Sequence, residues 1–211
     1  MIKRLPAALL IVALLAGPTA LAQRGPGGQM RIVLLVDSSS AVASMLTQFR
    51  AGLNGFLDAL PGEPEIVIIS TGGQLRIRVG PTSDRLKLHA AASGFASDGG
   101  GNMLLDTLLE ADQRFLKSTP DRRSVFVILT TDVNSAIGDL RTDLYNRFLE
   151  NFLTRGGRAH AIVIRGMNSG VTSQIAENLA HNTGGFFEIV EIANAVPKLM
   201  KTLADYVAAD Q

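Results

Sequence analysis

The chain has 211 residues, of which 46% are hydrophobic and 18% charged, as expected of one globular domain with its own core. The 20 basic and 19 acidic residues nearly cancel and form no basic run, which gives no electrostatic reason to expect nucleic acid as a partner. The absence of cysteine excludes thiol catalysis, cysteine-based metal sites and an anchor of the lipidated-cysteine type.

The first 22 residues have the three parts of a secretory signal peptide. A basic start at Lys3 and Arg4 precedes an apolar run over residues 7–17, and Ala20-Leu21-Ala22 forms an Ala-x-Ala cleavage site. The apolar run is about half as long as a bilayer span requires. We therefore expect cleavage before Gln23, with a retained membrane anchor as the alternative.

Cleavage would remove two basic residues and no acidic residue, leaving 18 and 19 and a net charge of −1. The protein would then be periplasmic or secreted, with no stable membrane insertion. Residues 23–29 are rich in glycine and predict a flexible lead-in, and residues 30–211 form the predicted domain.

The first half of the domain alternates apolar runs with amphipathic stretches. In chain order, the patterns predict a strand over residues 30–36, a helix over 42–60, a strand over 66–69, a strand over 74–79 and a short helix over 83–92. The first strand is nearly all apolar, which is typical of the centre of a parallel sheet. Ser39 or Ser40 is expected to cap the first helix. Strict alternation over residues 74–79 predicts a half-exposed antiparallel edge strand.

The second half continues the alternation. The patterns predict a helix over residues 103–116, a strand over 125–129, a helix over 140–152, a strand over 159–164, a helix over 171–179, a strand over 186–190 and a helix over 196–206. Strands that alternate with helices predict a three-layer, doubly wound α/β domain of the Rossmann-like kind. Its six-stranded sheet should be mostly parallel, with one antiparallel edge strand.

Polar residues follow the predicted strands at ends that should converge. Asp37-Ser38-Ser39-Ser40 follows the first strand, Thr131-Asp132 follows the strand over residues 125–129, and a loop rich in glycine and serine ends at Asn102. Ligands bind at the carboxyl ends of the strands in such sheets. Carboxylate, hydroxyl and amide oxygens together suit Mg²⁺, Mn²⁺ or Ca²⁺ rather than zinc or copper.

At these segments the chain resembles the von Willebrand factor type A family. The strand ending at Asp37 resembles that family's first strand, residues 99–106 (GGGNMLLD) its Gly-Gly-Thr loop and helix, and residues 127–132 (VILTTD) its strand ending in Thr-Asp. Residues 176–187 resemble its penultimate helix and Thr-Gly-Gly-aromatic last strand. The resemblance covers residues 30–206 and implies a non-catalytic domain that binds a protein partner.

The resemblance also implies a metal-ion-dependent adhesion site, built in that family from Asp-x-Ser-x-Ser, a Thr and a second Asp. Asp37, Ser39 and Asp132 match, whereas Ala41 stands at the final Ser position and Asn102 at the Thr position. The candidate metal ligands are therefore Asp37, Ser39, Asn102 and Asp132, with Mg²⁺, Mn²⁺ or Ca²⁺ as the ion and no organic cofactor. In the alternative interpretation no ion binds: Asp37 and Ser39 cap the first helix and bond across the loop, and Asp132 accepts bonds from backbone N–H groups.

Sequence motifs of enzymes are missing. There is no Gly-x-Ser-x-Gly elbow, and Gly99-Gly100-Gly101 follows a loop and lacks the endings of nucleotide-binding loops. We expect an exported interaction domain rather than an enzyme, with a protein partner bound through a divalent cation and a partner carboxylate. A metal-free scaffold or assembly domain, which uses a different face for assembly, is the alternative on the same fold. A hydrolase or nucleotide-binding enzyme is the alternative of another class.

Overall fold

The computed structural model describes residues 30–132, 141–166 and 170–210. The predicted signal peptide over residues 1–22 and the lead-in over residues 23–29 lie outside this part. In the ranges described, no helix is both long and apolar enough to cross a membrane.

A single six-stranded sheet runs through the centre of the domain. Its strands are β1 (Met30–Val36), β2 (Glu65–Ser70), β3 (Arg76–Thr82), β4 (Arg123–Thr131), β5 (Arg158–Ile164) and β6 (Phe187–Val190). They lie in the order β3-β2-β1-β4-β5-β6. β3 is antiparallel to β2, and every other neighbouring pair is parallel. The predicted fold class, including the antiparallel edge strand, is confirmed.

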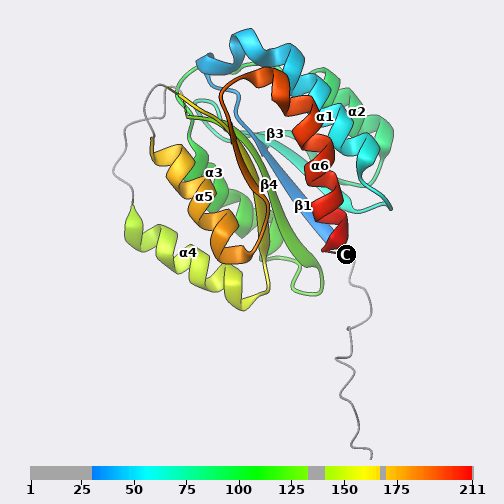
Figure 1. Cartoon of the computed structure of the whole chain (residues 1–211). Coiled ribbons are helices and arrows are strands. Elements are labelled where there is room, and N and C mark those ends of the chain that lie inside the picture. Colours follow the sequence, from blue (N-terminus) through cyan, green and yellow to red (C-terminus); the bar gives the residue numbers. More distant parts are fainter. Residues whose placement is uncertain (1–29, 133–140, 167–169, 211) are drawn as a thin grey trace, which may run out of the picture.

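Six α-helices cover the two faces of the sheet. They are α1 (Leu46–Ala59), α2 (Arg85–Ser93), α3 (Leu104–Ala111), α4 (Thr142–Thr154), α5 (Val171–Thr183) and α6 (Val196–Ala209). Shorter turns join them: the 3₁₀ turns η1 (Ser40–Met45) and η3 (Ala193–Ala195) and the π-helical turn η2 (Asp112–Leu116). α1, α2 and α6 pack on one face and α3, α4 and α5 on the other, giving three layers (Figure 1).

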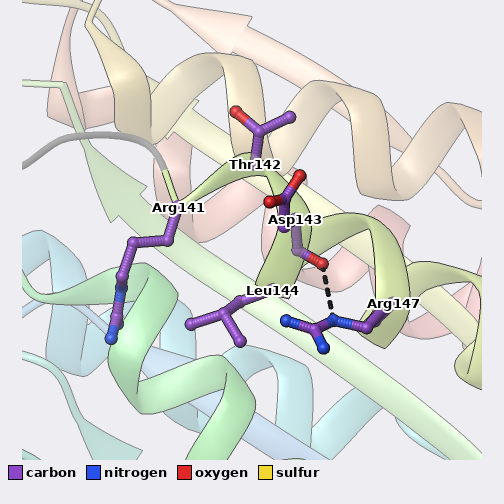
Figure 2. Close-up of a pocket in the computed structure, with 5 residues that line it drawn as sticks. All are labelled: Arg141, Thr142, Asp143, Leu144 and Arg147. Carbon is purple, nitrogen blue, oxygen red and sulfur yellow. Dashed lines mark hydrogen bonds between the residues drawn. The ribbon is translucent and has the colours of Figure 1, made fainter.

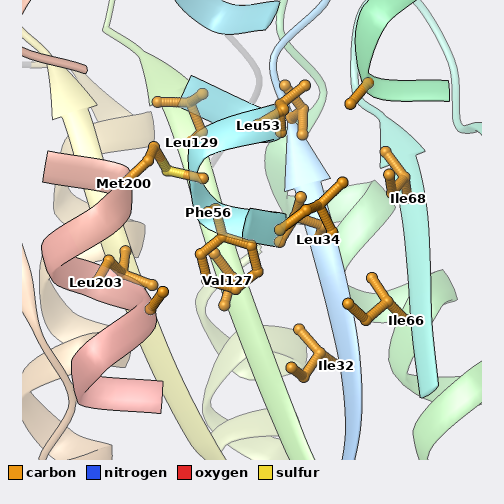
Figure 3. Packing of buried hydrophobic residues seen from close by; sticks show 14 of the residues in the cluster. Ile32, Leu34, Leu53, Phe56, Ile66, Ile68, Val127, Leu129, Met200 and Leu203 are labelled. Atoms are coloured by element: carbon orange, nitrogen blue, oxygen red, sulfur yellow. The ribbon is translucent and has the colours of Figure 1, made fainter. Parts of the chain in front are cut away.

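The core consists of two apolar layers, one on each side of the sheet. Alternate residues of β1 enter opposite layers: Ile32 and Leu34 pack toward α1 and α6, whereas Val33 and Leu35 pack toward α3, α4 and α5. Figure 3 shows the first of these layers between the strands and α6. Burial on both faces explains why the central strands are continuous apolar runs.

The edge strand departs from the predicted alternation. Its pairing with β2 shifts register twice between Ile66 and Ile69, as at a β-bulge. The alternation over residues 74–79 predicts that Leu75, Ile77 and Val79 share one face. That prediction is wrong, because Leu75 packs against one core layer and Val79 against the other. Ile77 stays 41% exposed.

Candidate functional site at the carboxyl edge of the sheet

Asp37 joins the carboxyl ends of β1 and β4. Its backbone N–H donates to the carbonyl oxygen of Leu129 at 2.9 Å. Its Oδ2 atom accepts hydrogen bonds from the Thr131 backbone N–H at 3.1 Å and from the Thr131 hydroxyl, and its Oδ1 accepts from the Ser39 N–H at 2.8 Å. The side chain is fully buried. The last residue of β1, Val36, pairs with Leu129, and β4 continues to Thr131, which places Thr131 beside Asp37.

Asn102 completes this cluster from the glycine-rich loop. Its Oδ1 accepts a hydrogen bond from the Thr71 hydroxyl at 2.7 Å. Its Nδ2 donates to Asp37 Oδ2 at 3.1 Å, to Thr130 Oγ1 at 2.7 Å and to the Thr131 carbonyl at 3.3 Å. A carbonyl and a carboxylate can only accept, so the amide nitrogen has to face them. The sequence prediction that Asp37 and Asn102 converge is thus confirmed.

Hydrogen-bond donors surround the Asp37 carboxyl group and offset part of the effect of its burial. Burial raises the pKa of its carboxyl group and outweighs the hydrogen bonds from Thr131 and Ser39, which lower it. No basic side chain contributes to this balance in the part of the chain that the structure describes. The Asp37 carboxyl is therefore held by dipoles from the strand ends and the loop.

Ser39 does not act as the predicted helix cap. It lies at the position before η1, but its side chain makes no capping hydrogen bond. The hydroxyl is buried near the Asp37 carboxyl, whose pKa it lowers, and has no hydrogen-bond partner of good geometry among the described residues. Ser40 is exposed, and its hydroxyl donates to the Gly100 carbonyl at 3.2 Å. The prediction of a Ser39 or Ser40 cap is wrong because one side chain turns inward and the other bonds the loop.

Close backbone contact brings the loops together. Gly72 pairs with Asn102, and its N–H donates to Ser38 Oγ at 2.9 Å. A Cβ atom at Gly72 would lie 2.4 Å from the Ser38 carbonyl carbon, which excludes any other residue without movement of the backbone.

Asp98 is a site residue that sequence reasoning missed. Its carboxylate accepts from the Ser70 hydroxyl at 2.8 Å and pairs with Arg76 at 2.8 Å and with Arg78. Burial alone would raise its pKa, but hydrogen bonds from Ser38 and Ser70 and the charges of Arg78 and Arg76 together lower it. The feature of the sequence that could have indicated this ion-pair cluster is one acidic residue in the loop together with two arginines at alternate positions of the edge strand.

Asp132 lies at the same edge but bonds a helix. Its Oδ2 accepts from the Gly170 N–H at 2.6 Å and from the Ser173 hydroxyl at 2.8 Å, and its Oδ1 accepts from the Ser173 N–H at 3.3 Å. Gly170 is the residue before α5 and has no side chain to cap it. Asp132 therefore supplies acceptors for the first turn of α5, as the interpretation without an ion predicts.

An open pocket lies beside α4. It is lined by Arg141, Thr142, Asp143, Leu144 and Arg147 (Figure 2). Arg147 Nε donates to the Asp143 carbonyl at 3.1 Å, and Arg141 pairs with Asp106 of α3. None of the four predicted metal ligands lines this pocket.

Comparison with known proteins identifies the fold through structure and not through sequence. No protein-family model matches the sequence, and no curated protein matches it either. A von Willebrand factor type A structure from Catenulispora acidiphila superposes with a TM-score of 0.68 at 12% identity, over 86% of this chain and 43% of that one. The fold is that of a von Willebrand factor type A-like domain.

Two other structures extend the comparison. The pilus adhesin SpaC of Lactobacillus rhamnosus GG, in an open conformation, gives a TM-score of 0.67 at 14% identity over 88% of this chain and 31% of that one. Proximal thread matrix protein 1 of the mussel byssus, with a zinc-occupied MIDAS motif, gives 0.64 at 15% identity over 85% and 48%. The chain thus spans less than half the length of each of these three proteins.

The residues of this type A-like domain do not fit a divalent cation in the arrangement described. Mg²⁺ requires near-octahedral oxygen ligands at about 2.0–2.1 Å. Asn102 presents its nitrogen to Asp37 and turns its oxygen to Thr71. Ala41 offers no side-chain oxygen, and both oxygens of Asp132 accept bonds from α5. Over the described ranges, no group of three acidic or histidine side chains is placed to hold a metal ion.

Proposed function

We propose that this chain is an exported, non-catalytic domain that binds a protein partner without a divalent cation. The observation that carries the proposal is the hydrogen bonding of Asp37, whose carboxyl oxygens accept from Thr131, Asn102 and Ser39. A bridging cation needs oxygen atoms that are free to coordinate it, whereas the carboxyl oxygens of Asp37 already accept hydrogen bonds. The proposal therefore shares the absence of an ion with the scaffold alternative, but it keeps the partner at the carboxyl edge of the sheet.

The fold supports a role in binding. One of the similar structures is named a pilus adhesin and another a thread matrix protein. These names belong to those proteins, and fold alone does not determine function. Their bearing on this chain is that the type A-like fold can serve attachment and assembly.

The histidines have positions that favour structural roles. His89 contacts Asn54 Oδ1 at 2.7 Å, and His160 bonds Asp210 at 2.9 Å. His181 packs its ring edge-on against Phe187. Within the residues described, none hydrogen-bonds a serine or threonine hydroxyl, which a hydrolase of the serine–histidine type requires.

Export rests on the sequence of residues 1–22. The basic start, apolar run and Ala-x-Ala site favour secretion to the periplasm or beyond. Because the chain has no cysteine, we expect its stability to come from the two buried apolar layers.

Capture of the partner by the tagged full chain tests the proposal, with one variant at each end of the sheet. Gln74 is exposed beside the carboxyl edge, and Gln113 is exposed at the opposite end, next to the Phe115 carbonyl that Arg31 bonds. We expect one protein to be captured equally in EDTA and in millimolar Mg²⁺, less by Gln74→Arg and normally by Gln113→Arg. Capture that EDTA abolishes would contradict the metal-free mode. Equal capture by all three chains would place the binding surface elsewhere.

A further inference from the structure

We infer that the Asn102 carboxamide is a built-in substitute for a divalent cation, so that this one side chain decides whether an ion binds among the oxygens of Asp37, Thr130 and Thr131. That set of ligands includes neither position 41 nor Asp132. The inference deepens the proposed function, on whose metal-free mode it rests. It assigns to Asn102 the task of donating a hydrogen bond to Asp37 and of tying two strand ends to the loop.

The oxygens around the amide nitrogen are those that a hard cation would use. Nδ2 is shared by a carboxylate oxygen of Asp37, the hydroxyl of Thr130 and the carbonyl of Thr131, at 2.7–3.3 Å. Hard cations take the same three kinds of oxygen, but at about 2.0–2.6 Å. The oxygens around Nδ2 are thus of the kinds that bind a hard cation, but their distances from the nitrogen are those of hydrogen bonds. The positive end of the amide dipole faces these three oxygens, as the charge of an ion would.

The amide cannot turn away from this position at low cost. Asn102 is 4% exposed, its backbone pairs with Gly72, and the next N–H, of Met103, donates to the Thr71 carbonyl at 2.9 Å. The Thr71 hydroxyl donates to the amide oxygen. Rotation by half a turn would place that oxygen against the Thr131 carbonyl, which has no proton to donate, and would take the N–H donor away from Asp37 Oδ2.

Replacement of the nitrogen by oxygen should open the site to an ion. Asn102→Asp keeps the shape of the side chain and places a second carboxylate oxygen about 3.1 Å from Asp37 Oδ2. Two adjacent ligands of an octahedral ion with bonds of about 2.1 Å are about 3.0 Å apart, so the pair has the spacing of neighbouring ligands. Without an ion the two buried carboxylates repel each other. The buried Ser39 hydroxyl, near Asp37 and without a hydrogen-bond partner of good geometry among the described residues, is a further oxygen within the site.

Thermal unfolding of the full chain tests the inference. Wild type, Asn102→Asp and the control Asn146→Asp are compared in EDTA and in millimolar Mn²⁺ or Mg²⁺. Asn146 is exposed on α4, so its change adds the same charge far from Asp37. We expect Asn102→Asp to lower the melting temperature by about 10 °C in EDTA and Mn²⁺ to restore at least about 5 °C, with no ion effect on the other two chains.

The outcomes separate the inference from the proposed function. An Asn102→Asp chain that is destabilised but unaffected by either ion overturns the inference and leaves the metal-free function intact. A wild-type chain that Mn²⁺ stabilises contradicts the metal-free function itself. If Asn102→Asp does not fold in any buffer, the same unfolding measurements are made on Asn102→Thr, which removes the amide without adding charge. The same ion-dependent rise is then expected, and its absence overturns the inference.

Discussion

Thr131 bonds the Asp37 carboxyl group twice, through its backbone N–H at 3.1 Å and through its hydroxyl. The two residues follow or end neighbouring parallel strands, β1 and β4. A side chain that sequence patterns place at a ligand-binding position is therefore also a structural tie between the strands. Mutations at this edge of the sheet should therefore change the stability of the fold.

Asp37→Ala should strongly destabilise the fold. The change removes the acceptor of the buried Thr131 and Ser39 N–H groups and one of the three acceptors of the Asn102 amide, which costs about 3–5 kcal/mol of unfolding free energy in total. Urea unfolding followed by circular dichroism measures it. Asp205→Ala is the matched control, since Asp205 is exposed on α6 and its loss should change stability little. Equal stability of both variants would show that Asp37 is not a structural tie.

Asp132→Ala should loosen the start of α5 rather than the whole domain. The Gly170 and Ser173 N–H groups lose their acceptors and the helix N-terminus loses a negative charge, an effect of about 1–2 kcal/mol. Hydrogen exchange should become faster at Gly170 and Ser173 and stay unchanged in α1 and α6. Unchanged exchange at these two amides would contradict the capping role.

Asp98→Asn should cost about 1–2 kcal/mol at neutral pH, because Arg76 and Arg78 lose their buried anionic partner. The pKa of Asp98 is lowered from its ordinary value of 3.8 in the folded state. Its stabilisation is therefore complete above that value and is lost as the pH falls through the lower, folded pKa. The difference between wild type and variant should shrink in strongly acidic urea titrations. A difference that persists unchanged there would mean that the ion pairs do not contribute.

His160 should make the fold less stable in mild acid. Its Nδ1 accepts from the Phe186 N–H at 3.1 Å, and its Nε2 bonds Asp210 Oδ2 at 2.9 Å, so the neutral ring serves both partners. Burial lowers its pKa from the ordinary 6.5, although the nearby Asp210 raises it and Arg158 lowers it further.

The sign follows from this lowered pKa. The folded state binds fewer protons than the unfolded chain, so the stability due to neutral His160 is present above about pH 6.5 and declines as the pH falls below it. Between about pH 7.5 and about pH 5.5, the unfolding free energy should therefore decrease more for wild type than for His160→Gln. Asp37, whose pKa is raised, acts with the opposite sign, and the comparison with the variant cancels its share. Equal slopes would contradict the account.

Much of this architecture follows from patterns along the chain. The continuous apolar strands and the helical stripes predict three layers, and the strand ends place Asp37 and Asn102 together, as found. The direction of the Asn102 amide could not be predicted, because it depends on Thr71, 31 residues away in sequence, as the donor to its oxygen. The partner of Asp132 likewise comes from a helix 41 residues further on, which periodicity cannot reveal.

The central claim is that hydrogen bonds, and not a cation, hold the carboxyl edge together. Titration of the ¹⁵N-labelled full chain with Mn²⁺ tests it most directly, since a bound paramagnetic ion broadens the signals of nearby groups. The account predicts no selective loss of the Ser39 and Thr131 amide signals or of the Asn102 side-chain NH₂ signal. Selective loss of these three signals at low Mn²⁺ concentration, reversed by EDTA, would show that an ion enters the site and would contradict the claim.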